Sequence, residues 1–113
     1  MADENGWSRV IGADEVPDGK PVRVESPWGA VLVYARSEDV FAIANTCTHQ
    51  GAPLHRGPID VRTGTPIATC PAHGSMFDLA TGAVRRGPAT HPVPAYETRV
   101  AGDDVEIRPR PVS

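Results

Sequence analysis

Hydrophobic and polar positions along this chain group into short runs, and no run keeps a helical period. Stretches rich in Val, Ile, Tyr and Phe end at clusters of Gly, Pro, Asp or Ser, which is typical of strands separated by turns. We therefore expect strands rather than long helices. The expected strands are Ser8–Ile11, Pro21–Glu25, Ala30–Ala35, Val40–Ile43, Pro66–Thr69, Met76–Asp78, Tyr96–Ala101 and Asp104–Arg108.

Two pairs of these strands are expected to form hairpins. The segment AGDD, Ala101–Asp104, joins the last two strands, and Gly102 suits the positive φ of a tight turn. The segment SEDV, Ser37–Val40, has the composition of a second turn. Residues 30–43 are therefore expected to form one antiparallel pair.

The composition agrees with an all-β fold. Twelve prolines and eleven glycines lie between the expected strands, a distribution that is hard to reconcile with a helical bundle. The 40% hydrophobic and 22% charged residues fall in the range of globular proteins. We expect one domain over residues 1–113, built as an all-β sandwich or barrel of small sheets.

Charge and hydropathy narrow the functional classes. The formal net charge of -3 provides no basic patch for nucleic acid. No apolar run approaches the roughly 20 residues of a membrane-spanning helix, and the start MADENGWSRV lacks the basic and apolar regions of an export signal. We expect a cytoplasmic protein that binds neither nucleic acid nor a membrane.

Each cysteine of the chain lies close to a histidine in a loop between expected strands. Cys47 and His49 belong to the stretch CTHQGAPL, and Cys70 and His73 to CPAHGSMFDLATG. Histidine beside each cysteine and the missing export signal favour metal binding over a disulfide. Neither pair can complete a tetrahedral site alone, so the two loops would have to meet and contribute two ligands each.

Three interpretations of these pairs remain open on the residues alone. The first is chance, with buried cysteines and ordinary loop histidines. The second is a structural zinc site of the Cys₂His₂ kind, although zinc modules more often group the cysteines together and the histidines together. The third is a two-iron, two-sulfide cluster in which one iron takes both thiolates and the other takes both imidazoles.

The two stretches resemble the cluster-binding boxes of Rieske iron-sulfur proteins. The segment GPATHPVPAYETRV is similar to the proline-containing loop and following strand that cover the cluster in that family. The resemblance implies a Rieske-type small sandwich of antiparallel sheets with a two-loop cluster-binding subdomain, at about residues 45–94. It also implies one 2Fe-2S cluster, with Cys47 and Cys70 on the inner iron and His49 and His73 on the outer iron near the surface.

The resemblance also bears on the reduction potential. Two neutral imidazoles in place of two thiolates make reduction easier, so Rieske centres span roughly -150 to +300 mV against about -400 mV for plant-type ferredoxins. High-potential respiratory Rieske proteins add a disulfide between the loops and Ser and Tyr hydroxyls near the sulfurs. This chain has Ala52 and Ala72 around the disulfide positions, Phe77 at the Tyr position, and Ser75 as the remaining hydroxyl. We expect a potential toward the bottom of the Rieske range.

The implied function is electron transfer rather than catalysis. The chain resembles the Rieske-type ferredoxin component of a multicomponent Rieske non-haem iron oxygenase system, which passes single electrons from a flavin-dependent ferredoxin reductase to a terminal oxygenase. An alternative within electron transfer is the small Rieske-like subunit of an assimilatory nitrite reductase. An alternative of a different class is a zinc-stabilised interaction domain.

Residues near the four ligand candidates carry further expectations. Gly51 and Gly74 are expected to allow backbone amide groups to approach the cluster sulfides closely, and His55 is expected to be a solvated loop residue. The loop tips around Gln50, His73 and His91 should form the docking face for partner proteins. Pro88, Pro92 and Pro94 are expected to close over the cluster and exclude water. Charges at the rim of this face are expected from Arg56, Arg85 and Arg86.

Overall fold

The strands of this protein form two antiparallel sheets in a computed structural model that describes residues 6–62 and 64–110. The larger sheet contains β1 (Ser8–Gly12), β2 (Val22–Ser26), β3 (Gly29–Arg36), β4 (Asp39–Ala44), β9 (Ala95–Ala101) and β10 (Asp104–Pro109). The smaller sheet contains β5 (Ile59–Asp60), β6 (Ile67–Thr69), β7 (Met76–Asp78) and β8 (Val84–Arg86). Two 3₁₀ turns, η1 (Ala13–Glu15) and η2 (Leu54–Arg56), join strands.

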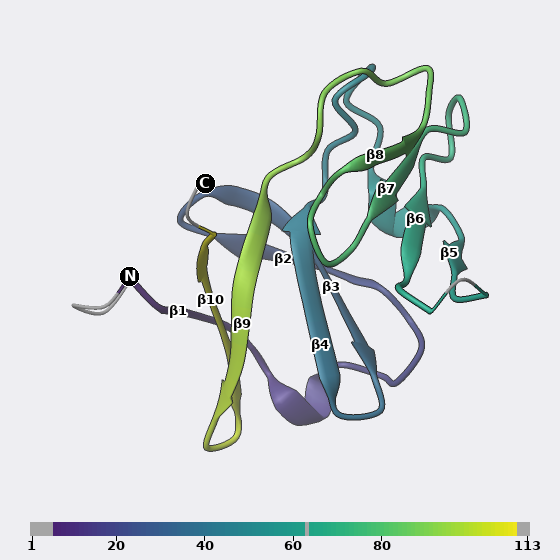
Figure 1. Ribbon diagram of the computed structural model, residues 1–113. Coiled ribbons are helices and arrows are strands. Elements are labelled where there is room, and N and C mark those ends of the chain that lie inside the picture. The colour runs from purple at the N-terminus through teal and green to yellow at the C-terminus, as the bar shows by residue number, and fades with distance from the viewer. Residues whose placement is uncertain (1–5, 63, 111–113) are drawn as a thin grey trace.

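The strand order places the smaller sheet at one end of the larger one. The larger sheet has the order β1-β10-β9-β4-β3-β2 and the smaller the order β5-β6-β7-β8 (Figure 1). The edge strands β1 and β2 of the larger sheet contact each other, so this sheet is strongly curled. The all-β sandwich expected from the sequence is confirmed.

All eight expected strands are present, and both expected hairpins are confirmed. The β3–β4 pair places Tyr34 opposite Phe41, and the turn between these strands contains Ser37 at φ 56°. The β9–β10 pair places Val100 opposite Val105, and Gly102 takes the positive φ of its turn, at 62°. The short strands β5 and β8 were not expected from the sequence.

Strand β3 lies between two hydrophobic cores, which explains its continuous apolar run. Val31 and Val33 belong to the core inside the curled larger sheet. Leu32 and Tyr34, which alternate with them, belong to the core between the two sheets. Because successive side chains point to opposite faces of a strand, β3 is buried on both faces and carries no polar alternation.

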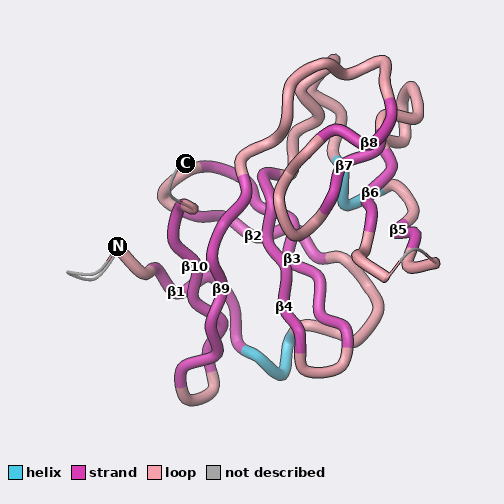
Figure 2. The backbone as a smooth tube through the Cα atoms, in the orientation of Figure 1, coloured by secondary structure: helices cyan, strands magenta, loops and turns pink. Residues whose placement is uncertain are grey.

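The segment that contains both Cys and His pairs is an excursion from the larger sheet. The chain leaves β4, builds the smaller sheet, and returns in β9, which pairs with β4 through Ala42 and Tyr96 (Figure 2). Both stretches that contain the Cys and His pairs therefore lie in loops at one end of the molecule. In the part of the chain that the structure describes, no helix has the length and apolar character needed to cross a bilayer.

Candidate metal centre

The first ligand loop connects β4 to η2 and closes on itself through backbone hydrogen bonds. The Cys47 amide donates to the Ala52 carbonyl at 2.9 Å, and the Gly51 amide donates to the Cys47 carbonyl at 2.8 Å. Thr46 and Pro53 form a β-bridge at the base of this loop. These bonds define the shape of the loop.

The second ligand loop, between β6 and β7, repeats the same backbone pattern. The Cys70 amide donates to the Ser75 carbonyl at 2.7 Å, and the Gly74 amide donates to the Cys70 carbonyl at 3.1 Å. Gly51 and Gly74 follow their cysteines at the same spacing and have φ of 77° and 79°. A Cβ at Gly74 would meet nothing within 4 Å, so the backbone conformation is what calls for glycine there.

The amides of Gly51 and Gly74 donate to the carbonyl oxygens of Cys47 and Cys70. The expected approach of backbone amide groups to the cluster sulfides stays a prediction. The glycines therefore shape the two loops through their positive φ, and their amides are already used within the turns.

The four candidate ligands differ in burial in the order that the family resemblance implies. Cys47 and Cys70 are 2% and 3% exposed, and they form no disulfide with each other. His49 is half-buried and His73 is exposed. The two imidazole rings lie edge to face, with centroids 5.1 Å apart. The structure thus brings the two histidines together at the surface and places both cysteines in the core between the sheets.

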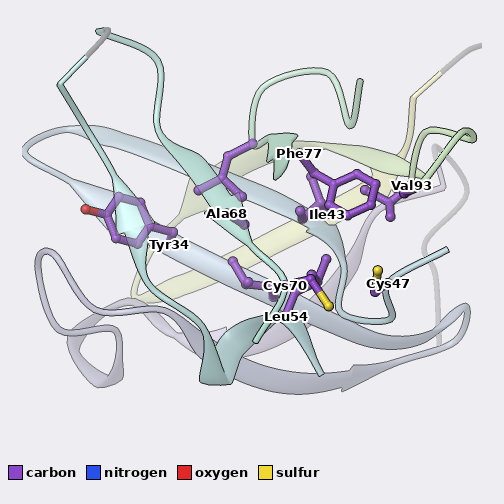
Figure 3. Packing of buried hydrophobic residues seen from close by; sticks show 11 residues of the cluster. Tyr34, Ile43, Cys47, Leu54, Ala68, Cys70, Phe77 and Val93 are labelled. Carbon is purple, nitrogen blue, oxygen red and sulfur yellow. The ribbon is translucent and has the colours of Figure 1, made fainter. Parts of the chain in front are cut away.

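The cysteines lie at one end of that core. Figure 3 shows Cys47 and Cys70 near Phe77 and Leu54, with Tyr34 at the opposite end of the cluster of side chains. Phe77 and Leu54 are fully buried. A group held by these cysteines would therefore be shielded from water on the inner side by hydrocarbon.

A buried imidazole nitrogen indicates that this site is built for a bound metal. Nδ1 of His49 is buried and has no hydrogen-bond partner among the described residues. A buried polar atom without a partner is costly, by about 1–3 kcal/mol. An iron atom bound at Nδ1 would remove this cost, and two thiolates and two imidazoles are the ligand set of a Rieske centre. The residues present fit the cluster.

The loop at residues 87–94 is tied to both ligand loops. The Ala89 amide donates to Oγ of the fully buried Ser75 at 3.0 Å. Oγ1 of Thr48 donates to the His91 carbonyl at 2.6 Å. Ala89 and Val93 are the buried residues of this segment. Pro88, Pro92 and Pro94, which were expected to close over the cluster, are exposed.

The sequence suggested Arg85 as a rim charge, but the structure pairs its guanidinium with a buried carboxylate. Its guanidinium donates to Oδ2 of Asp78 at 2.5 Å, and the Asp78 side chain is 3% exposed. Burial opposes ionisation of Asp78, but hydrogen bonds from Arg85, Ala80 and Thr81 outweigh it and hold the pKa of this carboxyl below its usual value. Arg85 therefore holds the β7–β8 hairpin together, although more than half of its side chain is exposed. Arg86 is exposed as well.

His55 is also not the solvated residue that the sequence suggested. It is half-buried, and its Nδ1 lies 2.8 Å from Nδ2 of the buried Asn45. Burial, together with the positive charges of Arg56 and Arg23, lowers the pKa of His55. Asn45 was not singled out from the sequence, because a lone asparagine at the end of a strand has no distinctive pattern.

Comparisons with known proteins agree with this geometry. Residues 6–97 match the model of the Rieske [2Fe-2S] domain. The chain is 31% identical over 102 residues to ferredoxin CarAc of Metapseudomonas resinovorans, and this alignment covers 89% of this chain and 92% of the relative. The ferredoxin of carbazole 1,9a-dioxygenase from Nocardioides aromaticivorans IC177 superposes with a TM-score of 0.83, at 31% identity over 92% of this chain and 98% of that chain.

Two further solved structures bear on function and fold. A chain in the complex of reduced oxygenase and oxidised ferredoxin of carbazole 1,9a-dioxygenase has a TM-score of 0.78 and 30% identity, over 91% of this chain and 93% of that chain. A putative nitrite reductase small subunit from Mycobacterium tuberculosis has a TM-score of 0.77 over 95% and 96% of the two chains. At 24% identity it shows the fold alone. The chain therefore belongs to the Rieske [2Fe-2S] domain family and binds one cluster of that kind, which replaces the zinc and chance interpretations.

Proposed function

We propose that this chain is the ferredoxin component of a multicomponent Rieske oxygenase system. It carries single electrons from a flavin-dependent ferredoxin reductase to a terminal oxygenase and is not itself an enzyme. The observation that carries this proposal is the match to oxygenase ferredoxins over nearly the whole of both chains. A related ferredoxin also occurs in a solved complex with its oxygenase.

The proposed ligands are Cys47 and Cys70 for the inner iron and His49 and His73 for the outer iron. Their burial supports this division, because the cysteines lie in the core and the histidines lie at the surface. When bound, the cluster supplies a one-electron couple. The cysteine side holds it away from water, and the histidine rings provide the short route for electrons to a partner.

The proposed docking face consists of the loop tips around Gln50, His73 and His91. All three residues are exposed, and the covering loop that contains His91 is tied to the first ligand loop through Thr48. A docking face held by hydrogen bonds loses little freedom when a partner binds. Exposed arginines at its rim would guide a partner of opposite charge; Arg56 and Arg86 remain as candidates.

The domain boundaries and location follow the same proposal. We propose that residues 1–113 act as one Rieske domain, with the cluster-binding part at about residues 45–94, and that the protein works in the cytoplasm. The excursion between β4 and β9 supports these bounds, because it contains both ligand loops and the covering loop.

Electron delivery to defined partners tests the proposal. The reduced protein is mixed with an oxidised terminal oxygenase from the same organism, and the visible spectra of both proteins are followed in a stopped-flow instrument. Transfer within the turnover time of the oxygenase is expected. Transfer to a sirohaem nitrite reductase from the same organism, with none to the oxygenase, would instead establish the nitrite reductase alternative.

A further inference from the structure

Hydrogen bonds between Asn45 and the segment Leu54–His55 connect the two ends of the first ligand loop. Asn45 follows β4 and is 2% exposed, and His55 lies in η2, where the loop ends. The Leu54 amide donates to the Asn45 carbonyl at 2.8 Å, and the His55 amide donates to Oδ1 of Asn45 at 2.8 Å. Nδ2 of Asn45 lies 2.8 Å from Nδ1 of His55. Three hydrogen bonds thus connect the entrance and the exit of the loop that contains Cys47 and His49.

The backbone fixes the direction of the bond between the two side chains. A backbone amide can only donate, so the Asn45 atom that faces the His55 amide must be the oxygen. The Asn45 nitrogen therefore faces the ring of His55 and donates to it. It follows that Nδ1 of His55 accepts, and that the ring is neutral with its proton on Nε2.

Protonation of His55 would break this arrangement. A proton on Nδ1 would point at the NH₂ group of Asn45, so that two donors faced each other. A flip of the Asn45 amide would relieve that contact, but it would direct the NH₂ group at the His55 amide. Neither orientation preserves all three hydrogen bonds.

The charged surroundings of His55 act in the same direction. Arg56 on η2 and Arg23 on β2 both place positive charge near the ring. Arg23 is itself paired with Glu25, at 2.5 Å. Strand β6, which packs against η2, contributes no ionisable side chain in Ile67–Thr69. Burial and both arginines therefore lower the pKa of His55. Among the residues that the structure describes, the hydrogen-bond network of His55 contains no carboxylate that could stabilise its charged form.

We infer that Asn45 and His55 are positioning residues that hold the first ligand loop closed around its cysteine and histidine. Uptake of one proton by His55 disrupts these hydrogen bonds and lets the loop open. The inference rests on the proposed ligand loop but goes beyond the proposed electron transfer. Because the folded state favours the neutral ring, the stabilisation is present above about pH 6.5 and is lost as the pH falls through the lowered pKa of His55.

Three variants separate the acceptor from the titration. His55→Asn places an amide oxygen near the position of Nδ1, so it can still accept from Asn45 but takes up no proton. His55→Leu removes the acceptor at every pH. Lys20→Asn is the control, because Lys20 is exposed and lies between η1 and β2, outside both ligand loops.

Cluster release to an iron chelator is followed by visible absorbance between pH 4.5 and 7.5. Acid promotes release in every variant, so the informative quantity is the ratio of the unmodified protein's rate to the variant's rate. For His55→Asn, the ratio of the unmodified protein's release rate to the variant's should be near one at pH 7.5 and should rise about tenfold by pH 4.5. A tenfold change corresponds to the loss of about one buried hydrogen bond. His55→Leu should release the cluster about tenfold faster than the unmodified protein already at pH 7.5.

A measurement on the unmodified protein does not depend on how well the variants fold. Amide hydrogen exchange at Leu54 and His55, corrected for its intrinsic pH dependence, should lose protection over the same pH range in which the ring nitrogens of His55 titrate by NMR. An unchanged rate ratio against His55→Asn, or protection that persists through the titration, would overturn the inference. A protein that contains no cluster at pH 7.5 would instead contradict the proposed function.

Discussion

At the residue scale, Phe77 and Ser75 occupy the positions that the family resemblance places next to the cluster sulfurs. Both side chains are fully buried, and Oγ of Ser75 accepts a hydrogen bond from the Ala89 amide. Phe77 contributes a hydrocarbon ring at the position where the family resemblance places a tyrosine hydroxyl. Hydrogen bonds to the sulfurs stabilise the more negative reduced state. The expected potential is therefore toward the bottom of the Rieske range.

A hydroxyl added at Phe77 should raise the potential. Phe77→Tyr is expected to shift it upward by on the order of 50 mV, which corresponds to about 1 kcal/mol for a one-electron couple. Protein-film voltammetry measures the shift. Phe41→Tyr, the same change at a half-buried ring on β4, serves as the control. No shift at Phe77, or an equal shift at Phe41, would show that the hydroxyl does not reach the sulfurs.

The β7–β8 hairpin shows how an ion pair holds one element of the small sheet. Asp78 on β7 is buried, and it accepts hydrogen bonds from Arg85 on β8 and from the amides of Ala80 and Thr81 in the turn. Loss of one partner would leave a buried carboxylate poorly satisfied. Arg85 is thus a structural residue, although more than half of its side chain is exposed.

Removal of the Arg85 charge should destabilise the protein. Arg85→Met is expected to reduce the free energy of unfolding by about 1–3 kcal/mol at pH 7. Because the pKa of Asp78 is lowered in the folded state, this stabilisation is present above about pH 4 and is lost as the pH falls through the lowered pKa. Urea unfolding at pH 7 and near pH 3 measures both effects.

The control for this prediction is the exposed pair of Arg62 and Asp60. Arg62 donates to Asp60 at 2.8 Å, and 87% of its side chain is exposed. Arg62→Met should destabilise the protein clearly less than Arg85→Met does, because solvent screens exposed pairs. Equal losses in the two variants would show that burial of Asp78 adds nothing.

The sequence predicts long strands and spaced motifs well, and short or paired features poorly. The eight expected strands and the Cys and His pairs each have a local pattern. Strand β5 has two residues and β8 has three, so neither can show a period. Asp78 could not be identified as the partner of Arg85 from the sequence, because only the β7–β8 hairpin brings these two residues together and β8 was not expected. Likewise, the bond between Asn45 and His55 depends on how the ligand loop closes.

The whole molecule separates a rigid base from an electron-transfer end. The curled larger sheet forms the base, and the ligand loops and covering loop lie together at one end (Figure 1). Lys20 lies near the end of β3 that is opposite the ligand loops. At that end the Gly19 amide donates to the Ala35 carbonyl. Charges at the two ends should therefore affect partner binding differently.

Reversal of a charge at the cluster end should slow electron transfer. Arg86→Glu is expected to lower the rate with a partner and to weaken its salt dependence, while the spectrum and potential stay nearly unchanged. Lys20→Glu alters the net charge equally but should leave the rate close to that of the unmodified protein. Stopped-flow rates across a salt series decide the matter: equal behaviour of the two variants would remove Arg86 from the docking face.

The central claim is that two loops of this chain hold one Rieske cluster. Iron, zinc and acid-labile sulfide are measured in protein purified without air, and an EPR spectrum is recorded after reduction. About two irons and two sulfides per chain are expected, with the EPR signal of a reduced Rieske centre. One zinc per chain without sulfide, and no EPR signal after reduction, would contradict the account.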